Sequence, residues 1–221
     1  MYAIDNIHLR TEINCEQGSK EWHMQRLGVI TASNFDKVMV DGKSTNGLGA
    51  SAITYMSELV AEILTGQWDT SSFAATEWGK ANEPFARERY EEETRCKVET
   101  IGFIKMGERE MIGFSPDGKV IPFEETKKII EIKCPFKSGN HIENLKKGLP
   151  KKYYWQCMGG MMVTGATSCD FVSFDPRLKA KSLQLKIHTI QRDEVAIASL
   201  LTKLTVFENA LHKELEEIGF F

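Results

Sequence analysis

The stretch SPDG at residues 115–118, followed by IEIK at residues 130–133, decides the fold. The first stretch is typical of a turn, and the second alternates apolar and charged side chains as a strand does. In such a strand Glu131 and Lys133 project from one face and the two isoleucines from the other. The apolar flanks indicate a central strand, which seldom directs a glutamate and a lysine inward without pairing them or binding a metal.

Asp117, Glu131 and Lys133 are the groups that metal-assisted phosphodiester hydrolysis needs, with 13 residues between the two carboxylates. Carboxylate oxygens and the Ile132 carbonyl can hold Mg²⁺, which lowers the pKa of a bound water, while the lysine steadies the developing charge. An ordinary turn beside a solvated Glu–Lys pair is the alternative, since short acidic patterns recur widely.

Glu83 and Gln156 are candidates to complete such a site. Glu83 lies 34 residues before Asp117 on an expected helix, where Gly79 would allow a close approach to the sheet. Tyr153 and Gln156 are three residues apart on one face of another expected helix, where they can meet a phosphate or the attacking water. The ordinary alternatives are a solvated glutamate for Glu83 and a core aromatic beside a surface glutamine for the pair.

RLGVITAS at residues 26–33 predicts a phosphate-binding pocket. Arg26 precedes a turn at Gly28, and Thr31 and Ser33 stand where a second helix is expected to begin. Free N–H groups at a helix start attract phosphate, and an arginine adds bidentate contacts. Plain N-capping beside a solvated arginine is the alternative.

Basic residues gather in two further places and are candidates for contacts with a nucleic-acid backbone, although such runs are usually solvated surface. They are Lys146, Lys147, Lys151 and Lys152, and then Arg177, Lys179 and Lys181.

Apolar periodicity places helices and strands around these motifs. Helices are expected over residues 19–28, 53–66, 74–95 and 193–218, with another starting near Pro150. Strands are expected over residues 98–105, 111–114, 129–133, 170–174 and 183–190. This order predicts an α/β fold in which a mixed central β-sheet is flanked by helices.

Length and composition limit the class of protein. The 221 residues suit a single domain over 1–221, and no apolar run is long enough to suggest a membrane span. Residues 1–14 lack the pattern of a signal peptide, so we expect a cytoplasmic protein. The five cysteines are scattered and are expected to be reduced thiols. A net charge of −3 means that local basic residues must provide any binding to DNA.

Together these motifs resemble the phage lambda exonuclease family, also described as YqaJ-type viral recombinases, within the restriction-endonuclease-like PD-(D/E)xK superfamily. The similarity spans most of the chain. The matching segments are Trp22-His23, residues 26–33, Trp78-Gly79-Lys80 with Glu83, residues 115–118, residues 131–136, Tyr153 with Gln156, and Asp175-Pro176-Arg177.

The resemblance implies a Mg²⁺-dependent 5′→3′ exonuclease on double-stranded DNA that releases 5′-mononucleotides and leaves a 3′ single strand for annealing recombination. It also implies a homotrimeric ring, a single-strand annealing protein as partner, and a phage or prophage gene expressed in a bacterial host. The alternatives are a single-strand or endonucleolytic nuclease of the same superfamily and a catalytically silent DNA-binding module.

Roles follow from the resemblance residue by residue. Asp117 would bridge two Mg²⁺ ions, for which Mn²⁺ can substitute; Glu131 and the Ile132 carbonyl would complete one site and Glu83 the other. Lys133 with Gln156 would orient or activate the water. The residues expected to hold phosphate are Arg26, Thr31, Ser33 and Ser115.

The sequence departs from the family pattern at two places. Gly139 stands where an arginine is expected, so that Lys137 is the substitute for DNA contact. Thr76 and Glu77 stand where an apolar residue is expected to help split the duplex end.

Overall fold

The computed structural model describes residues 10–43, 47–68, 74–107 and 109–220. The helices are α1 (Lys20–Arg26), α2 (Phe35–Val38), α3 (Ala50–Thr65), α4 (Ala74–Thr94), α5 (Phe123–Thr126), α6 (Ser138–Lys147), α7 (Lys151–Thr164) and α8 (Glu194–Ile218). The strands are β1 (Arg10–Ile13), β2 (Ile30–Thr31), β3 (Lys97–Glu99), β4 (Phe103–Met106), β5 (Arg109–Phe114), β6 (Gly118–Ile121), β7 (Lys128–Lys133), β8 (Ser168–Phe174) and β9 (Leu185–Gln191).

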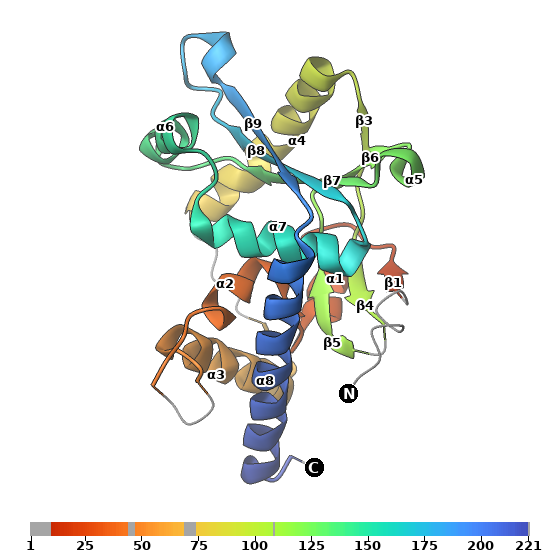
Figure 1. The fold of residues 1–221 in the computed structure, drawn as a ribbon, viewed down its shortest axis with the longest axis vertical. Coiled ribbons are helices and arrows are strands. Elements are labelled where there is room, and N and C mark those ends of the chain that lie inside the picture. Colours follow the sequence, from red (N-terminus) through yellow and green to blue (C-terminus); the bar gives the residue numbers. More distant parts are fainter. Residues whose placement is uncertain (1–9, 44–46, 69–73, 108, 221) are drawn as a thin grey trace.

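The strands form two mixed sheets, whereas the sequence predicted one central sheet. The first has the order β1-β4-β5-β2 and the second the order β3-β6-β7-β8-β9. Within the second sheet β7 and β8 run parallel and the other neighbours antiparallel. The predicted α/β class with flanking helices is confirmed, and Figure 1 shows the second sheet above the first.

The prediction of a single strand over residues 98–105 is wrong. These residues contribute to β3 in the second sheet and to β4 in the first, so the chain changes sheets between them. Gly102 lies at the change, where a Cβ would come 2.4 Å from the carbonyl oxygen of Cys15. Such a close approach of two backbones leaves room only for glycine.

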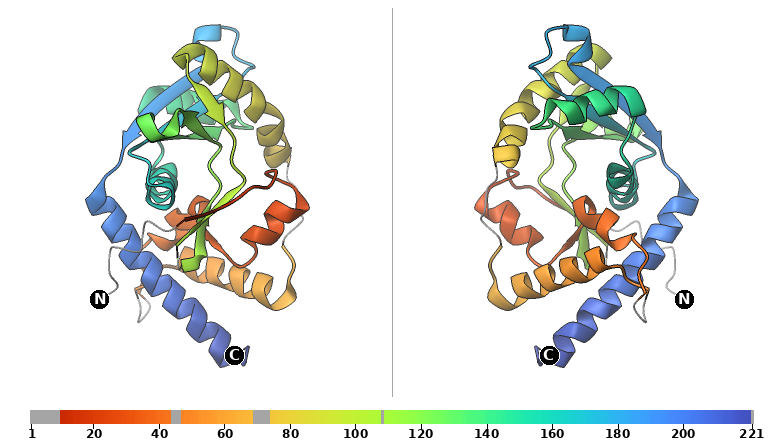
Figure 2. Two further views of the ribbon diagram at one scale, coloured as in Figure 1. Left: turned by 90° about the vertical axis from the view of Figure 1, so that its right-hand side faces the viewer. Right: turned by 90° about the vertical axis from the view of Figure 1, so that its left-hand side faces the viewer.

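The second sheet lies between two apolar layers that come from opposite sides of β7. Ile129 packs into the larger core together with Met158 and Met161 of α7. Ile130 and Ile132 belong instead to a smaller core beneath α4. The alternation of side chains along β7 therefore assigns one face to α7 and the other to α4, and Figure 2 shows both helices beside this sheet.

The C-terminal helix α8 begins where the sequence predicts. The side chain of Asp193 caps it by accepting hydrogen bonds from the N–H groups of Val195 and Ala196. Its buried residues, among them Leu200, Leu204 and Leu211, recur at helical spacing and join the larger core. In Figure 1 this dark blue helix passes α3 and extends away from both sheets.

None of the helices in the described part of the chain has the length and apolarity needed to span a bilayer. The five cysteines, Cys15, Cys96, Cys134, Cys157 and Cys169, are free thiols, as predicted.

Candidate active site

Asp117 takes its position from the turn between β5 and β6. Its carboxylate oxygen Oδ2 accepts a hydrogen bond from the backbone N–H of Ile132 on β7, with N and O 2.5 Å apart. Gly118 follows, and a Cβ there would lie 2.1 Å from Cγ1 of Val98. The absence of a side chain at this position therefore lets β6 lie directly against β3 at the end of the turn.

Glu131 and Lys133 leave the same face of β7, as the alternation predicts. Nζ of Lys133 lies 2.5 Å from Oε1 of Glu131, and Nε2 of Gln156 on α7 donates to the same oxygen at 2.5 Å. Glu131 is only 1% exposed, and its second oxygen, Oε2, is buried without a hydrogen-bond partner. Such an oxygen is costly in free energy unless a cation or donor binds it.

Burial and mutual repulsion raise the pKa values of the carboxyl groups. Burial, with Asp117 adding to it, raises the pKa of Glu131 to about 8 and that of Glu83 to about 7. Burial also raises the pKa of Asp117, although Lys133 opposes the shift. Burial alone would lower the pKa of Lys133, but the neighbouring carboxylates outweigh it and raise that pKa. Carboxyl groups that raise one another's pKa favour a proton or a cation in the space that they share.

Glu83 reaches the site from α4 together with Arg87, one helical turn further on. A guanidinium nitrogen of Arg87 lies 2.7 Å from Oε1 of Glu83 and 3.2 Å from the carbonyl oxygen of Asp117. No sequence pattern pointed to Arg87, because Glu–Arg pairs at this spacing are common on solvated helices. The role expected of Gly79 is wrong, since a Cβ there would meet nothing within 4 Å. Arg87, rather than a close helix approach, ties α4 to the Asp117 turn.

The donor set suits a hard divalent cation. Among the described residues, no three carboxylate, histidine or cysteine side chains are gathered closely enough to hold an ion as they stand. Glu83 instead faces Arg87, and Glu131 faces Lys133. Carboxylate oxygens are the ligands that Mg²⁺ prefers, and the unpartnered Oε2 of Glu131 remains free to receive one. The residues present fit Mg²⁺ once the carboxylates turn away from their cationic partners.

Arg26, the last residue of α1, holds its guanidinium among aromatic rings. Its Cζ lies 4.2 Å from the ring centroid of Trp22, and Nη1 donates to Oγ of Ser115 at 3.2 Å. The indole N–H of Trp22 donates to the same hydroxyl at 2.8 Å. Burial lowers the pKa of Arg26. A partly buried guanidinium is stabilised by an anion, so this pocket suits a phosphate.

The helix start expected at Thr31 and Ser33 differs from the prediction. Thr31 ends strand β2, and the chain then forms a 3₁₀ turn over Ala32–Asn34 before the four-residue helix α2. The hydroxyl of Thr31 makes no capping hydrogen bond to the following backbone and instead lies 3.2 Å from that of Ser33. The β-branched pair Ile30–Thr31 favours strand pairing with β5 over a helix. The phosphate-binding pocket predicted here would therefore depend on side chains rather than on a helix terminus.

Two cavities meet at the carboxylates. One of about 1410 Å³ extends toward Arg26, and one of about 890 Å³ extends along α7 and the segment after β7. Both are lined by Ser33, Thr76, Lys80, Glu83, Asp117, Lys133 and Gln156. Ser115 and Glu131 line only the first. Ile132, Lys137 and Tyr153 line only the second. Thr31 is buried and lines neither.

Tyr153 packs against the larger core and also lines the second cavity. Its ring stacks on Phe171 with centroids 5.1 Å apart, and Nζ of Lys133 lies 5.4 Å from its centroid. Lys137 is exposed beside this cavity, near the position of Gly139. Both placements are compatible with contact to a bound strand.

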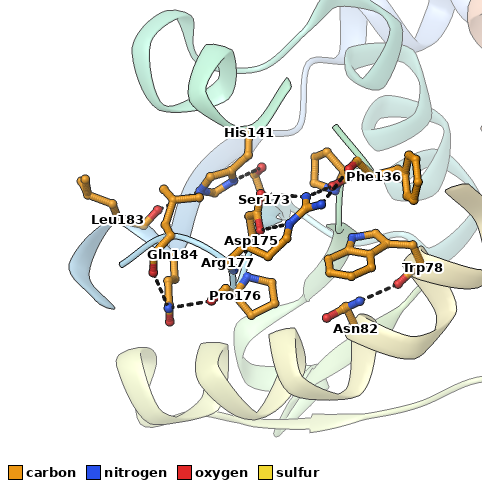
Figure 3. A network of polar contacts seen from close by, with 12 residues as sticks. Trp78, Asn82, Phe136, His141, Ser173, Asp175, Pro176, Arg177, Leu183 and Gln184 are labelled. Carbon is orange, nitrogen blue, oxygen red and sulfur yellow. Dashed lines mark hydrogen bonds and ion pairs between the residues drawn. The ribbon is translucent and has the colours of Figure 1, made fainter. Parts of the chain in front are cut away.

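Arg177, a candidate for contact with a nucleic-acid backbone, binds groups of the protein itself, although its side chain is 38% exposed. Its guanidinium donates to both oxygens of Asp175, at 2.8 and 2.9 Å, and to the carbonyl oxygens of Pro135 and Phe136, both at 2.9 Å. Its Cζ lies 4.2 Å from the ring centroid of Trp78 on α4. Figure 3 shows Arg177 between Asp175 and Phe136, with the indole of Trp78 beside it. The sequence placed Arg177 in the family segment Asp175-Pro176-Arg177 as well as among the basic residues, but it did not predict these contacts within the protein.

Comparisons with known proteins show the family and the fold to which this chain is related. Among curated proteins no sequence matches significantly. Two crystal structures of an alkaline exonuclease (LHK-Exo) from Laribacter hongkongensis, one of them in complex with dAMP, are similar over 90% of this chain and 96% of theirs. Their sequences are 39% identical to this one, and the TM-scores are 0.80 and 0.81.

A phage-related exonuclease from Haemophilus somnus 129PT shares the fold, with a TM-score of 0.68 at 19% identity over 86% of this chain and 96% of that one. The model of the YqaJ-like viral recombinase domain matches residues 21–167, which include every carboxylate of the site. This chain belongs to the YqaJ-like viral recombinase family.

Proposed function

We propose that this protein is a Mg²⁺-dependent exonuclease that degrades double-stranded DNA in the 5′→3′ direction. It releases 5′-mononucleotides and leaves a 3′ single strand for annealing recombination. The observation that carries the proposal is the first cavity, which Glu83, Asp117 and Glu131 line together with the partly buried Arg26. A cavity that offers metal ligands at one point and an anion-binding arginine at another suits a substrate with two phosphates, one terminal and one scissile.

Two Mg²⁺ ions are proposed, with Mn²⁺ as a substitute. Asp117 would contact both, Glu131 and the Ile132 carbonyl would hold one, and Glu83 the other. When bound, the ions polarise the phosphate and lower the pKa of water.

The protein's own groups complete the reaction. Lys133 holds a positive charge beside Glu131, where the pentacoordinate phosphate gains negative charge. Gln156, whose amide is fixed by its hydrogen bond to Glu131, orients the attacking water. Arg26 and Ser115 hold the 5′-terminal phosphate, and Ser33 lies at the junction of the two cavities, where the strand passes. Residues that bind only the end of the strand give an exonuclease its dependence on ends.

The proposed partners follow from family membership. In the cytoplasm of a bacterial host, the protein, encoded by a phage or prophage, would form a homotrimeric ring around duplex DNA. A single-strand annealing protein would take over the 3′ strand. The exonucleases to which this chain is similar support DNA as the substrate.

A single assay tests the proposal. Purified protein is incubated with Mg²⁺ and a linear duplex labelled at either its 5′ or its 3′ ends, and with closed circular DNA as the control. We expect rapid release of the 5′ label as a mononucleotide, late release of the 3′ label, and intact circles. Nicking of circles would favour an endonuclease, and no cleavage of any substrate would favour a silent DNA-binding module.

A further inference from the structure

Phe136 is an exposed aromatic side chain at the wall of the second cavity. Its ring is 46% exposed, and it lies three residues after Lys133, which lines the same cavity. Isolated exposed apolar residues are common on protein surfaces and need no explanation. Phe136 differs because the protein fixes it in place beside the catalytic groups.

The backbone of this segment is held by Arg177. The guanidinium donates to the carbonyl oxygens of Pro135 and Phe136, and it is itself fixed by the fully buried carboxylate of Asp175. These contacts use four of the five N–H donors of the guanidinium, and such a set of forked, charge-assisted hydrogen bonds restricts its movement. The segment therefore has little freedom to move away from the cavity.

The ring of Phe136 is also held by Trp78. The two rings meet edge to face, with centroids 6.4 Å apart and planes at 75°, and the indole in turn contacts the guanidinium of Arg177. In Figure 3 these three side chains lie next to one another. An aromatic surface ordered before binding loses little conformational entropy when a ligand packs on it.

The surroundings of the ring indicate what it contacts. Lys137 and Lys152 line the same cavity and attract a polyanion. One phenyl ring is too small for a protein interface but matches the flat face of a nucleobase. A DNA strand offers both features, since its phosphates can face the lysines while a base stacks on the ring.

We propose that Phe136 stacks on a nucleobase of the strand in the second cavity, and that Arg177 positions it for this contact. The inference rests on the proposed function, in which Arg26 takes the terminal phosphate in the first cavity. The stacked base then belongs to the strand on the other side of the scissile phosphate. Arg177 does not touch the substrate, so it is a positioning residue.

The test measures binding without cleavage. Affinities of 5′-phosphorylated duplexes are determined in EDTA for the wild type and Phe136→Ala, with a normal base or an abasic sugar at each of the first four 5′ nucleotides. We expect Phe136→Ala to weaken binding about tenfold. The difference in affinity between the wild type and Phe136→Ala should vanish when the abasic sugar replaces the base on which Phe136 stacks, because the wild type then has no stacking partner either. Phe136→Trp should restore the affinity for normal DNA.

Phe85→Ala is the matched control. Phe85 is 60% exposed on α4 and lines neither cavity, so its removal should leave every affinity unchanged. In Arg177→Met and Arg177→Lys the affinity should no longer depend on whether that base is present. Neither side chain has the forked N–H groups with which arginine holds the carbonyl oxygens of Pro135 and Phe136. Thermal unfolding identifies any variant that fails to fold. If Phe136→Ala is such a variant, the affinity of Phe136→Trp for normal and abasic DNA decides whether the ring at this position stacks on a base.

The outcomes separate the proposal from the proposed function. An equal loss at every abasic position would show that Phe136 contacts no base, and retention of the base dependence in both Arg177 variants would remove the role of Arg177. Release of mononucleotides from 3′ ends would overturn the polarity of the nuclease instead. The binding assay contains no metal and would still report stacking in that case.

Discussion

Lys133 and Glu131 form an ion pair along one face of β7, with Nζ 2.5 Å from Oε1. The pair lies in a site where Glu131 is almost fully buried while the lysine keeps partial exposure toward the cavities. The ammonium group is therefore fixed at one end by the carboxylate and open to a ligand at the other. This placement suits a charge that stabilises a reacting phosphate.

Lys133→Ala is expected to slow cleavage by at least about a hundredfold, the scale associated with loss of one preorganised charge at the reacting group. Mg²⁺ affinity, measured by isothermal titration calorimetry, is expected to change little, because the lysine is not a ligand. A variant that lost Mg²⁺ binding would show that Lys133 organises the metal site instead of acting in the chemical step.

Asp117→Ala and Glu131→Ala are each expected to abolish cleavage and to leave duplex binding largely intact. Both remove a proposed metal ligand, but they also remove carboxyl groups that repel one another, so thermal stability should be unchanged or higher. Single-turnover cleavage and thermal unfolding measure the two effects. Substitution of the exposed Glu125 by alanine is the control, and near-normal cleavage by either site variant would refute the assignment.

Mg²⁺ binding is expected to strengthen as the pH rises through about 7 and about 8, because Glu83 and Glu131 must lose protons with those pKa values. Without metal, the free energy of unfolding should instead fall as the pH rises. In the unfolded chain glutamates ionise near a pKa of about 4.3, whereas in the folded protein Glu83 and Glu131 keep their protons up to their raised pKa values. The free energy of unfolding therefore falls as the pH rises from about 4.3 to those raised values.

Calorimetric titrations with Mg²⁺ and urea unfolding, both between about pH 6 and about pH 9, measure these two trends. Glu131→Gln should reduce the pH dependence of unfolding, since the amide does not titrate. A flat profile in the wild type would mean that the carboxyl groups are already ionised.

Arg26→Ala is expected to remove the preference for a 5′-phosphate over a 5′-hydroxyl end. The lost charged hydrogen bonds correspond to roughly 1.5–3 kcal/mol, or about tenfold to a hundredfold in affinity for phosphorylated ends. Cleavage of 5′-hydroxyl ends should hardly change. Initial rates on the two kinds of duplex give the comparison, and an equal loss on both would make Arg26 a general backbone contact.

Gly118→Ala is expected to destabilise the protein by about 1–3 kcal/mol, because the added methyl group would overlap the side chain of Val98. Gly79→Ala is the matched control, since open space surrounds that position and alanine favours a helix. Urea unfolding measures both. Equal free energies of unfolding for Gly118→Ala and Gly79→Ala would contradict the tight packing of the Asp117 turn.

The sequence predicted the parts of the site that depend on local pattern. Alternation in β7 is strong enough to place Glu131 and Lys133 on one face, and the three-residue spacing within α7 places Tyr153 and Gln156 on one face of that helix. The structure brings Glu83 to the same cavity. Their roles in catalysis remain predictions.

Other elements lack such a pattern. Helix α6 has only ten residues and buries the polar side chains His141 and Asn144, so few apolar residues mark it. Strand β6 has only four residues and comes directly after a turn. Arg87 and Arg177 bind groups that are distant in sequence or are backbone carbonyls. Residue types alone do not predict such contacts.

The engagement of Arg177 affects how the protein responds to salt. The slope of log affinity against log salt concentration counts the cationic side chains that displace counterions from DNA. Arg177 is already neutralised by Asp175, so it adds nothing to that slope, although it stands among the lysines in the sequence. The ionic-strength dependence of the proposed DNA binding would thus be set by fewer charges than the basic residues of the chain suggest.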